Sequence, residues 1–112
     1  MGTFTYDSNT KTEIEDRLLA HLQIVMGAKL RRSESFFFTW KDDVSLGSGR
    51  ITVWIHPGVA LKFKFHGSRQ PAISQLWLQS LVQTANQPHG LYATPEPTVG
   101  ASTEKPDLAA LM

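Results

Sequence analysis

Hydrophobic and polar residues alternate with a period of two over three consecutive segments in the middle of the chain, residues 35–40, 50–56 and 59–65. Such alternation is typical of β-strands that bury one face and expose the other. Turn formers fill residues 42–49 between the first two segments, and Pro57-Gly58 separates the last two. The pattern therefore predicts an antiparallel three-stranded meander.

Two other segments, residues 17–32 and 73–85, place apolar residues at the spacing of amphipathic helices. Asp16 precedes the first segment, and we expect its carboxylate to cap the free amides of the first turn. Pro71 precedes the second and suits the first position of a helix. His21 is expected on the surface of the first helix.

The remaining pattern completes an α+β fold. Residues 3–6 and 11–15 flank turn formers and predict an N-terminal hairpin, and residues 91–93 predict a last short strand. We expect one antiparallel sheet, made of the hairpin and the meander, with two helices packed on one face. Residues 1–94 form this single domain, and residues 95–112, rich in Pro, Glu, Ser, Thr and Gly, are expected to be a disordered tail.

Composition narrows the function further. The 112 residues carry a net charge of +1, which is too small to announce a nucleic-acid binder by itself. The chain has no cysteine, which excludes disulfides, thiolate zinc sites and cysteine nucleophiles. No apolar run approaches the length of a membrane span. We expect a cytoplasmic protein.

Catalytic motifs are absent from the sequence. There is no phosphate-binding glycine loop and no serine elbow, and the histidines lack the spacing of metal ligands. We therefore expect no enzyme activity, no cofactor and no metal.

The face of the meander opposite the apolar one carries the chemistry that stands out. Aromatic rings there could stack on unpaired bases, while Lys and Arg neutralise phosphates. The candidate binding face comprises Phe37, Arg50, Thr52, Trp54, His56, Lys62 and Lys64. Lys29, Arg31, Arg32 and Arg69 would extend its positive surface.

Several stretches together resemble a family of small actinobacterial proteins of unknown function, over the chain from its start to about residue 96. They are Thr5-Tyr6-Asp7-Ser8, Leu19-Ala20-His21-Leu22-Gln23, Gly27-Ala28-Lys29-Leu30-Arg31-Arg32, Trp40-Lys41-Asp42-Asp43, Trp54-Ile55-His56-Pro57 and Arg69-Gln70-Pro71-Ala72-Ile73. Members often carry the name "ATP-dependent DNA ligase", but the resemblance brings no established activity. A ligase needs Lys-x-Asp-Gly for its lysine nucleophile. Here Lys41-Asp42-Asp43 is followed by Val44.

These observations favour a non-catalytic binding or self-associating module. Exposed aromatic residues such as Phe37 and Trp54 need a partner, and the leading expectation is a homodimer or a complex with another protein. The alternative is a weak single-stranded nucleic-acid binder that uses Arg50, Trp54, Lys62 and Lys64.

Overall fold

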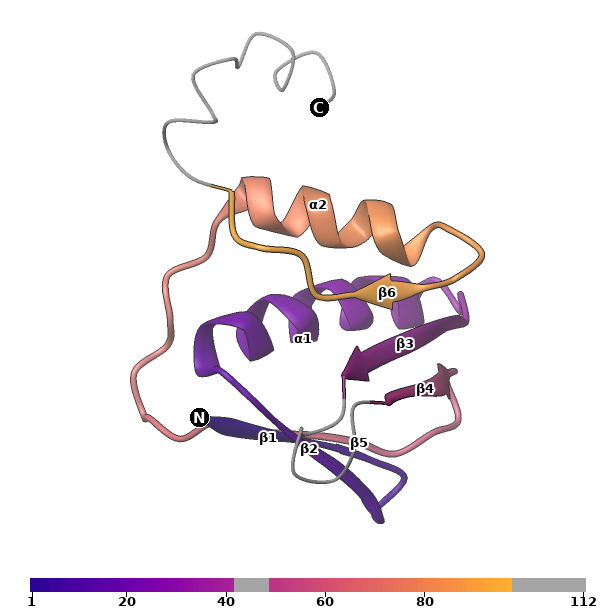
Figure 1. The fold of residues 1–112 in the computed structure, drawn as a ribbon, viewed down its shortest axis with the longest axis horizontal. Coiled ribbons are helices and arrows are strands. Elements are labelled where there is room, and N and C mark those ends of the chain that lie inside the picture. The colour runs from indigo at the N-terminus through magenta and orange to yellow at the C-terminus, as the bar shows by residue number, and fades with distance from the viewer. Residues whose placement is uncertain (42–48, 98–112) are drawn as a thin grey trace, which may run out of the picture.

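A computed structural model of the protein describes residues 1–41 and 49–97 (Figure 1). Within these residues the elements follow as β1 (Gly2–Tyr6), β2 (Thr10–Ile14), α1 (Asp16–Arg31), β3 (Phe36–Lys41), β4 (Arg50–Ile55), β5 (Leu61–Lys64), α2 (Gln75–Ala85) and β6 (Leu91–Tyr92). The α+β class is confirmed. The expected hairpin is also present, because β1 pairs with β2 in antiparallel register.

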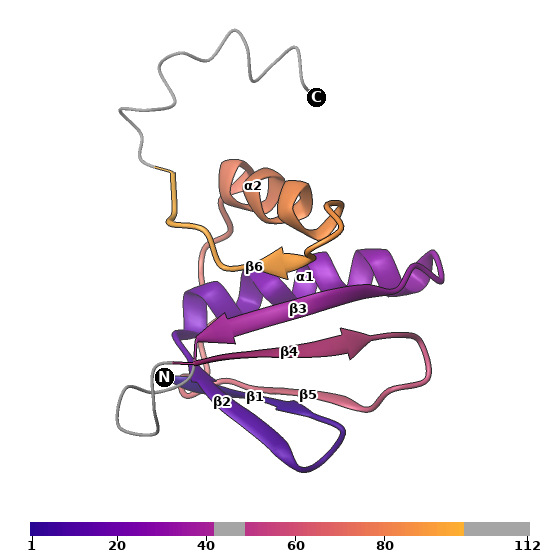
Figure 2. The same cartoon turned by 45° about the vertical axis from the view of Figure 1, so that its right-hand side comes forward.

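The strands form two small sheets, in the orders β2-β1-β5 and β4-β3-β6. The predicted three-stranded meander is therefore wrong in its pairing. β4 pairs with β3 as expected, but β5 pairs with β1 of the other sheet, although only residues 56–60, which include the Pro57-Gly58 turn, separate it from β4 (Figure 2). The final strand β6 runs parallel to β3.

The hairpin competes successfully for β5 because Phe4 of β1 lies opposite Phe63 of β5. The Phe4 ring is fully buried and also meets the Phe38 ring of the other sheet edge-on, with centroids 5.3 Å apart. A further link is the Tyr6 hydroxyl, which donates to the carbonyl oxygen of Trp54 at 2.7 Å. The two sheets therefore share one core although they share no strand.

Both helices lie on the same side of the strands, with α2 against α1 and β6 (Figures 1 and 2). Helix α1 buries Leu19, Leu22 and Val25 against the core, as its apolar spacing predicts. The expectation for Asp16 is wrong, because it is the first residue of the helix and makes no cap bond. Its carboxylate instead accepts the backbone amides of His66 and Gly67 at 3.0 and 2.9 Å.

Helix α2 begins at Gln75 and not at Pro71. Ser74 is its N-cap, and the Ser74 hydroxyl accepts the amide of Trp77. The Ser74 amide in turn donates to Nε2 of His21 at 2.9 Å. His21 is therefore buried, contrary to its expected place on the surface, because it joins the start of α2 to α1.

Residues after β6 run back along the helices. The indole N–H of Trp77 donates to the Thr94 carbonyl at 2.9 Å, and Arg17 forms an ion pair with Glu96. Residues 42–48 of the expected loop and residues 98–112 of the expected 95–112 tail lie outside the described residues. In the described part of the chain, neither helix has the length and apolar character needed to cross a bilayer.

Candidate functional site

The structure divides the predicted binding face between the two sheets. Phe37, Arg50, Thr52 and Trp54 lie on the outer face of the β4-β3-β6 sheet, and His56 follows the end of β4. Lys62 and Lys64 lie on β5, in the β2-β1-β5 sheet. The aromatic and the lysine chemistry expected together are thus carried by separate surfaces.

An exposed aromatic pair marks one end of the outer face of β4-β3-β6. Phe37 and Trp54 are neighbours in the β3–β4 register, and their rings lie 4.8 Å apart at 63°. Their inward neighbours Phe38 and Ile55 are buried, so strand alternation forces these two rings outward. Phe37 remains 42% exposed and Trp54 45% exposed. No element among the described residues covers these large apolar surfaces.

A third exposed aromatic, Tyr92, joins this face through β6. The parallel register places Tyr92 beside Thr39, and the tyrosine is 43% exposed. The sequence predicted a short strand here but gave no partner for it, so Tyr92 was missed. Phe37, Trp54 and Tyr92 are called the aromatic patch below.

The middle of the same face is polar and one end of it is cationic. The hydroxyls of Thr39 and Thr52 bond to each other at 2.7 Å. One step further along, Lys41 lies opposite Arg50, and both are exposed. The face therefore combines aromatic rings with the ammonium group of Lys41 and the guanidinium group of Arg50.

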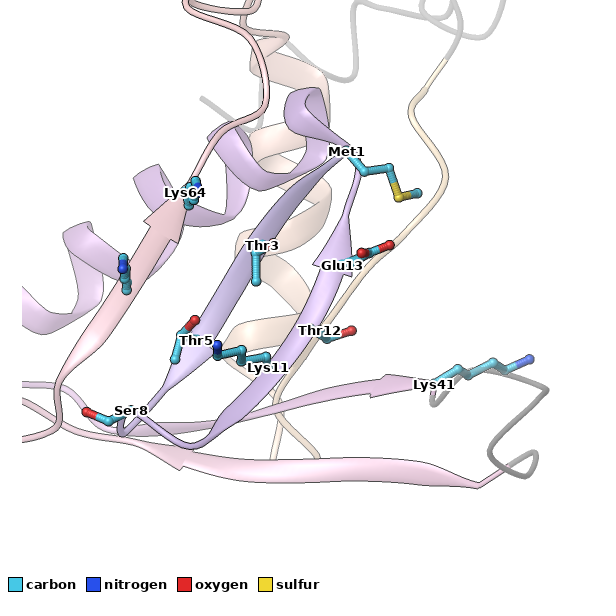
Figure 3. A pocket seen from close by; sticks show the side chains of 10 residues that line it. Met1, Thr3, Thr5, Ser8, Lys11, Thr12, Glu13, Lys41 and Lys64 are labelled. Carbon is cyan, nitrogen blue, oxygen red and sulfur yellow. The ribbon is translucent and has the colours of Figure 1, made fainter.

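The β2-β1-β5 sheet presents a second surface, the lysine face, made of Lys11, Lys62 and Lys64 with Thr3, Thr5 and Glu13. Lys11 and Lys62 flank Thr5, while Glu13 and Lys64 flank Thr3. These residues line a shallow concavity of about 890 Å³, which Lys41 also borders (Figure 3). Among the described residues that line it, four lysines and one carboxylate give this concavity a positive charge.

The four residues expected to extend the positive surface are dispersed. Lys29 reaches the aromatic pair, because it borders a hollow of about 690 Å³ with Phe37 and Trp54. Its ammonium is already bonded to Glu34 at 3.0 Å and to Asn86 at 2.7 Å. Arg31 and Arg32 lie exposed at the end of α1. Arg69 lines a different hollow beside α1.

The histidines have separate structural surroundings. Nδ1 of His56 accepts the Gly58 amide at 3.2 Å and so supports the turn after β4. His21 is buried and stacks on Trp77, with ring centroids 4.6 Å apart. Among the described residues, no three His, Asp or Glu side chains gather as metal ligands.

Fold and surfaces define a small α+β protein with an aromatic patch on one sheet and a lysine face on the other. Residues 1–96 match the model of a family described as a domain of unknown function (DUF7882), and the chain belongs to this family. Comparison with curated proteins found no match, and comparison with solved structures found none either.

Proposed function

We propose that the protein is a non-catalytic module that binds single-stranded nucleic acid on the outer face of β4-β3-β6. One observation carries the proposal: three half-exposed aromatic rings from three adjacent strands share a face with Arg50 and Lys41. Every base has a flat surface that can stack on an aromatic ring, and each phosphate needs a cation.

Charge supports the same ligand. The concavity at the cationic end of this face includes no carboxylate among the described residues that line it. The lysine face adds further cations around the neighbouring sheet. A polyanion is the ligand class that gains from such an arrangement.

Self-association through the aromatic patch is the second candidate, because exposed aromatic rings are enriched in protein interfaces. The patch alone is small for that role. Three rings that are less than half exposed offer roughly 300 Å² of surface, whereas a standard interface buries about 800 Å² on each partner. A strand that stacks one base on each ring needs no larger area.

The proposal includes no ligase activity. The family resemblance brings that name, but adenylylation needs Lys-x-Asp-Gly, and this chain has Val44 in place of the glycine. Lys41 itself is an exposed residue at the end of β3, beside the cations of both surfaces. Residues 42–44 lie outside the described residues.

Light scattering coupled to size exclusion, with a labelled single-stranded oligonucleotide of mixed sequence, tests the proposal. The oligonucleotide should co-elute with a monomer at low salt and dissociate at high salt. Trp54→Ala should weaken binding roughly fivefold to a hundredfold, which corresponds to one lost stacking contact. The Tyr6–Trp54 bond uses the Trp54 carbonyl, so it survives this substitution.

Ile24→Ala is the matched control, because Ile24 is a similarly exposed apolar residue on α1, away from the patch. It should leave oligonucleotide binding unchanged. A dimer that is stable at both salts and excludes the oligonucleotide would replace the proposal with self-association. A monomer that does not bind the oligonucleotide at low salt would refute the proposal.

A further inference from the structure

A concavity of about 610 Å³ lies where β6 ends beside β3. Strand β6 has only two residues, which pair with Phe38 and Thr39, so β3 continues past it through Trp40 and Lys41. The concavity is lined by Thr39, Trp40, Lys41, Arg50, His89, Tyr92 and Ala93. It is called the Tyr92 concavity below, and its volume falls in the range of small-ligand sites.

One wall of the Tyr92 concavity is aromatic. The Tyr92 ring is supported by His89, with ring centroids 5.3 Å apart at 39°. Both residues are exposed, and the hydroxyl-bearing Thr39 lies beside Tyr92 in the parallel register. A ring that is backed on one side and open to solvent can stack on a flat ligand.

Hydrogen-bond donors and cations supply the rest of the lining. Arg50 and Lys41 are register partners, so their charges enter from adjacent strands. The ring of Trp40 packs against Phe4 and Phe38 on the core side of β3, and its indole N–H is buried without a hydrogen-bond partner among the described residues. This donor lies on the opposite side of β3 from the side chains of Thr39 and Lys41, so the contacts to a ligand are assigned to Lys41 and Arg50.

We propose that the Tyr92 concavity binds one nucleotide unit, with the base stacked on Tyr92 and the phosphate held by Arg50 and Lys41. A flat, anionic ligand fits, because one wall is aromatic and the charged groups among the described lining residues are cations. If the nucleotide is part of a bound single strand, this inference rests on the proposed function. A free nucleotide has the same chemistry and could occupy the same site.

Titration of the ¹⁵N-labelled protein with adenosine 5′-monophosphate, followed by NMR, tests this site. The backbone amide signals of Trp40 and Tyr92, which both line the concavity, should shift in a saturable manner. The indole of Trp77 already donates to Thr94 and should stay in place as an internal reference. Adenosine lacks the phosphate and should bind more weakly.

Substitutions separate the base contact from the phosphate contact. Tyr92→Ala should weaken binding of adenosine 5′-monophosphate by about tenfold, as expected for a lost stacking contact. Arg50→Gln should weaken the binding of the monophosphate and leave the binding of adenosine unchanged. Arg69→Gln removes the same charge in another hollow and should change the binding of neither ligand. Circular dichroism of each variant checks that it is folded.

The outcomes distinguish this inference from the proposed function. Shifts at Trp40 and Tyr92 with the free monophosphate support a site for free nucleotides. Shifts there only with the oligonucleotide support a site within a bound strand. If neither ligand shifts them, and Tyr92→Ala has no effect while Trp54→Ala still weakens the oligonucleotide, the nucleotide site is refuted and the proposed function stands. Binding of the monophosphate without any binding of the oligonucleotide would support the nucleotide site and refute the proposed function.

Discussion

At the scale of single residues, His21 has both ring nitrogens committed. Nε2 accepts the Ser74 amide, so it carries no proton, and Nδ1 lies 2.7 Å from the Arg17 carbonyl, which can only accept. The ring is therefore neutral, with its proton on Nδ1. Through these two bonds a single buried side chain connects the interior of α1 to the first turn of α2.

His21→Leu should lower the free energy of unfolding by about 1–3 kcal/mol, because the Ser74 amide loses its acceptor in a buried place. Urea unfolding at neutral pH measures the change. His66→Leu is the control, since His66 is exposed and makes its contact with Asp16 through the backbone amide. Equal stability of the two variants would contradict the role assigned to His21.

Asp16 connects α1 to the chain after β5. The two backbone amides that it accepts, from Gly67 and then His66, lower the pKa of its carboxyl below the usual 3.8. A carboxyl whose pKa is lower in the folded state stabilises the fold fully above its unfolded pKa. That contribution disappears as the pH falls through the folded pKa.

Asp16→Asn should therefore destabilise the protein at neutral pH, and the difference from the unsubstituted protein should shrink as the pH falls below 3.8. Chemical unfolding across this pH range measures it. Asp7→Asn, which removes a carboxylate from the exposed turn between β1 and β2, is the control for the loss of a surface charge. A constant difference at every pH would mean that the Asp16 charge contributes nothing.

These two residues also show where sequence reasoning ended. Strand alternation correctly predicted that Phe37 and Trp54 face outward, because each inward neighbour is apolar. The partners of His21 and Asp16 are 53 and 51 residues away in sequence. Periodicity carries no information about such contacts, so a residue that looks like a cap or a surface histidine can have another role.

At the scale of elements, β6 depends on Gly90. Its φ is +91°, and a Cβ added there would lie 2.4 Å from the carbonyl oxygen and 2.6 Å from Cβ of Phe37. Only glycine allows the chain to approach β3 this closely. The absence of a side chain at Gly90 therefore allows β6 to lie beside β3, which places Tyr92 on the outer face.

Gly90→Ala should destabilise the protein by at least about 1–3 kcal/mol, since alanine would be strained at this φ and its Cβ would clash with the backbone of β3. Thermal unfolding measures the loss. Gly58→Ala is the matched control. Its Cβ would meet the His56 ring at 3.5 Å, which is an ordinary contact, and a change below about 0.5 kcal/mol is expected. Equal effects of both substitutions would show that β6 tolerates a side chain.

Element types and the pairing of β1 with β2 and of β3 with β4 were readable from the sequence, but the partners of β5 and β6 were not. All five strands before α2, and the short strand after it, follow from periodicity and turn residues. The exchange of β5 to the N-terminal hairpin depends on Phe4 meeting Phe63 across distant parts of the chain. The same exchange divides the predicted binding face. That prediction required Lys62 and Lys64 to lie in the same sheet as Trp54.

At the scale of the whole molecule, the two surfaces meet at Lys41. This residue borders both the concavity of the lysine face and the Tyr92 concavity. A single strand bound on the aromatic patch could therefore continue past Lys41 onto the lysine face, where Lys11 lies beside Thr5 (Figure 3). Such a path assigns stacking to one sheet and phosphate neutralisation to the other.

The salt dependence of binding tests this path. Each phosphate of a single strand that is neutralised contributes about 0.7 to the slope of the logarithm of affinity against the logarithm of salt concentration. The double variant Lys62→Gln/Lys64→Gln should therefore reduce that slope by about 1.4 for a long oligonucleotide. Arg31→Gln/Arg32→Gln removes the same charge at the end of α1, outside both concavities, and should leave the slope nearly unchanged. If both double variants reduce the slope equally, the overall charge of the protein governs binding and the lysine face has no special part in it. If only the lysine variant reduces it, while Trp54→Ala weakens binding at every salt concentration, the two sheets act as separate parts of one site.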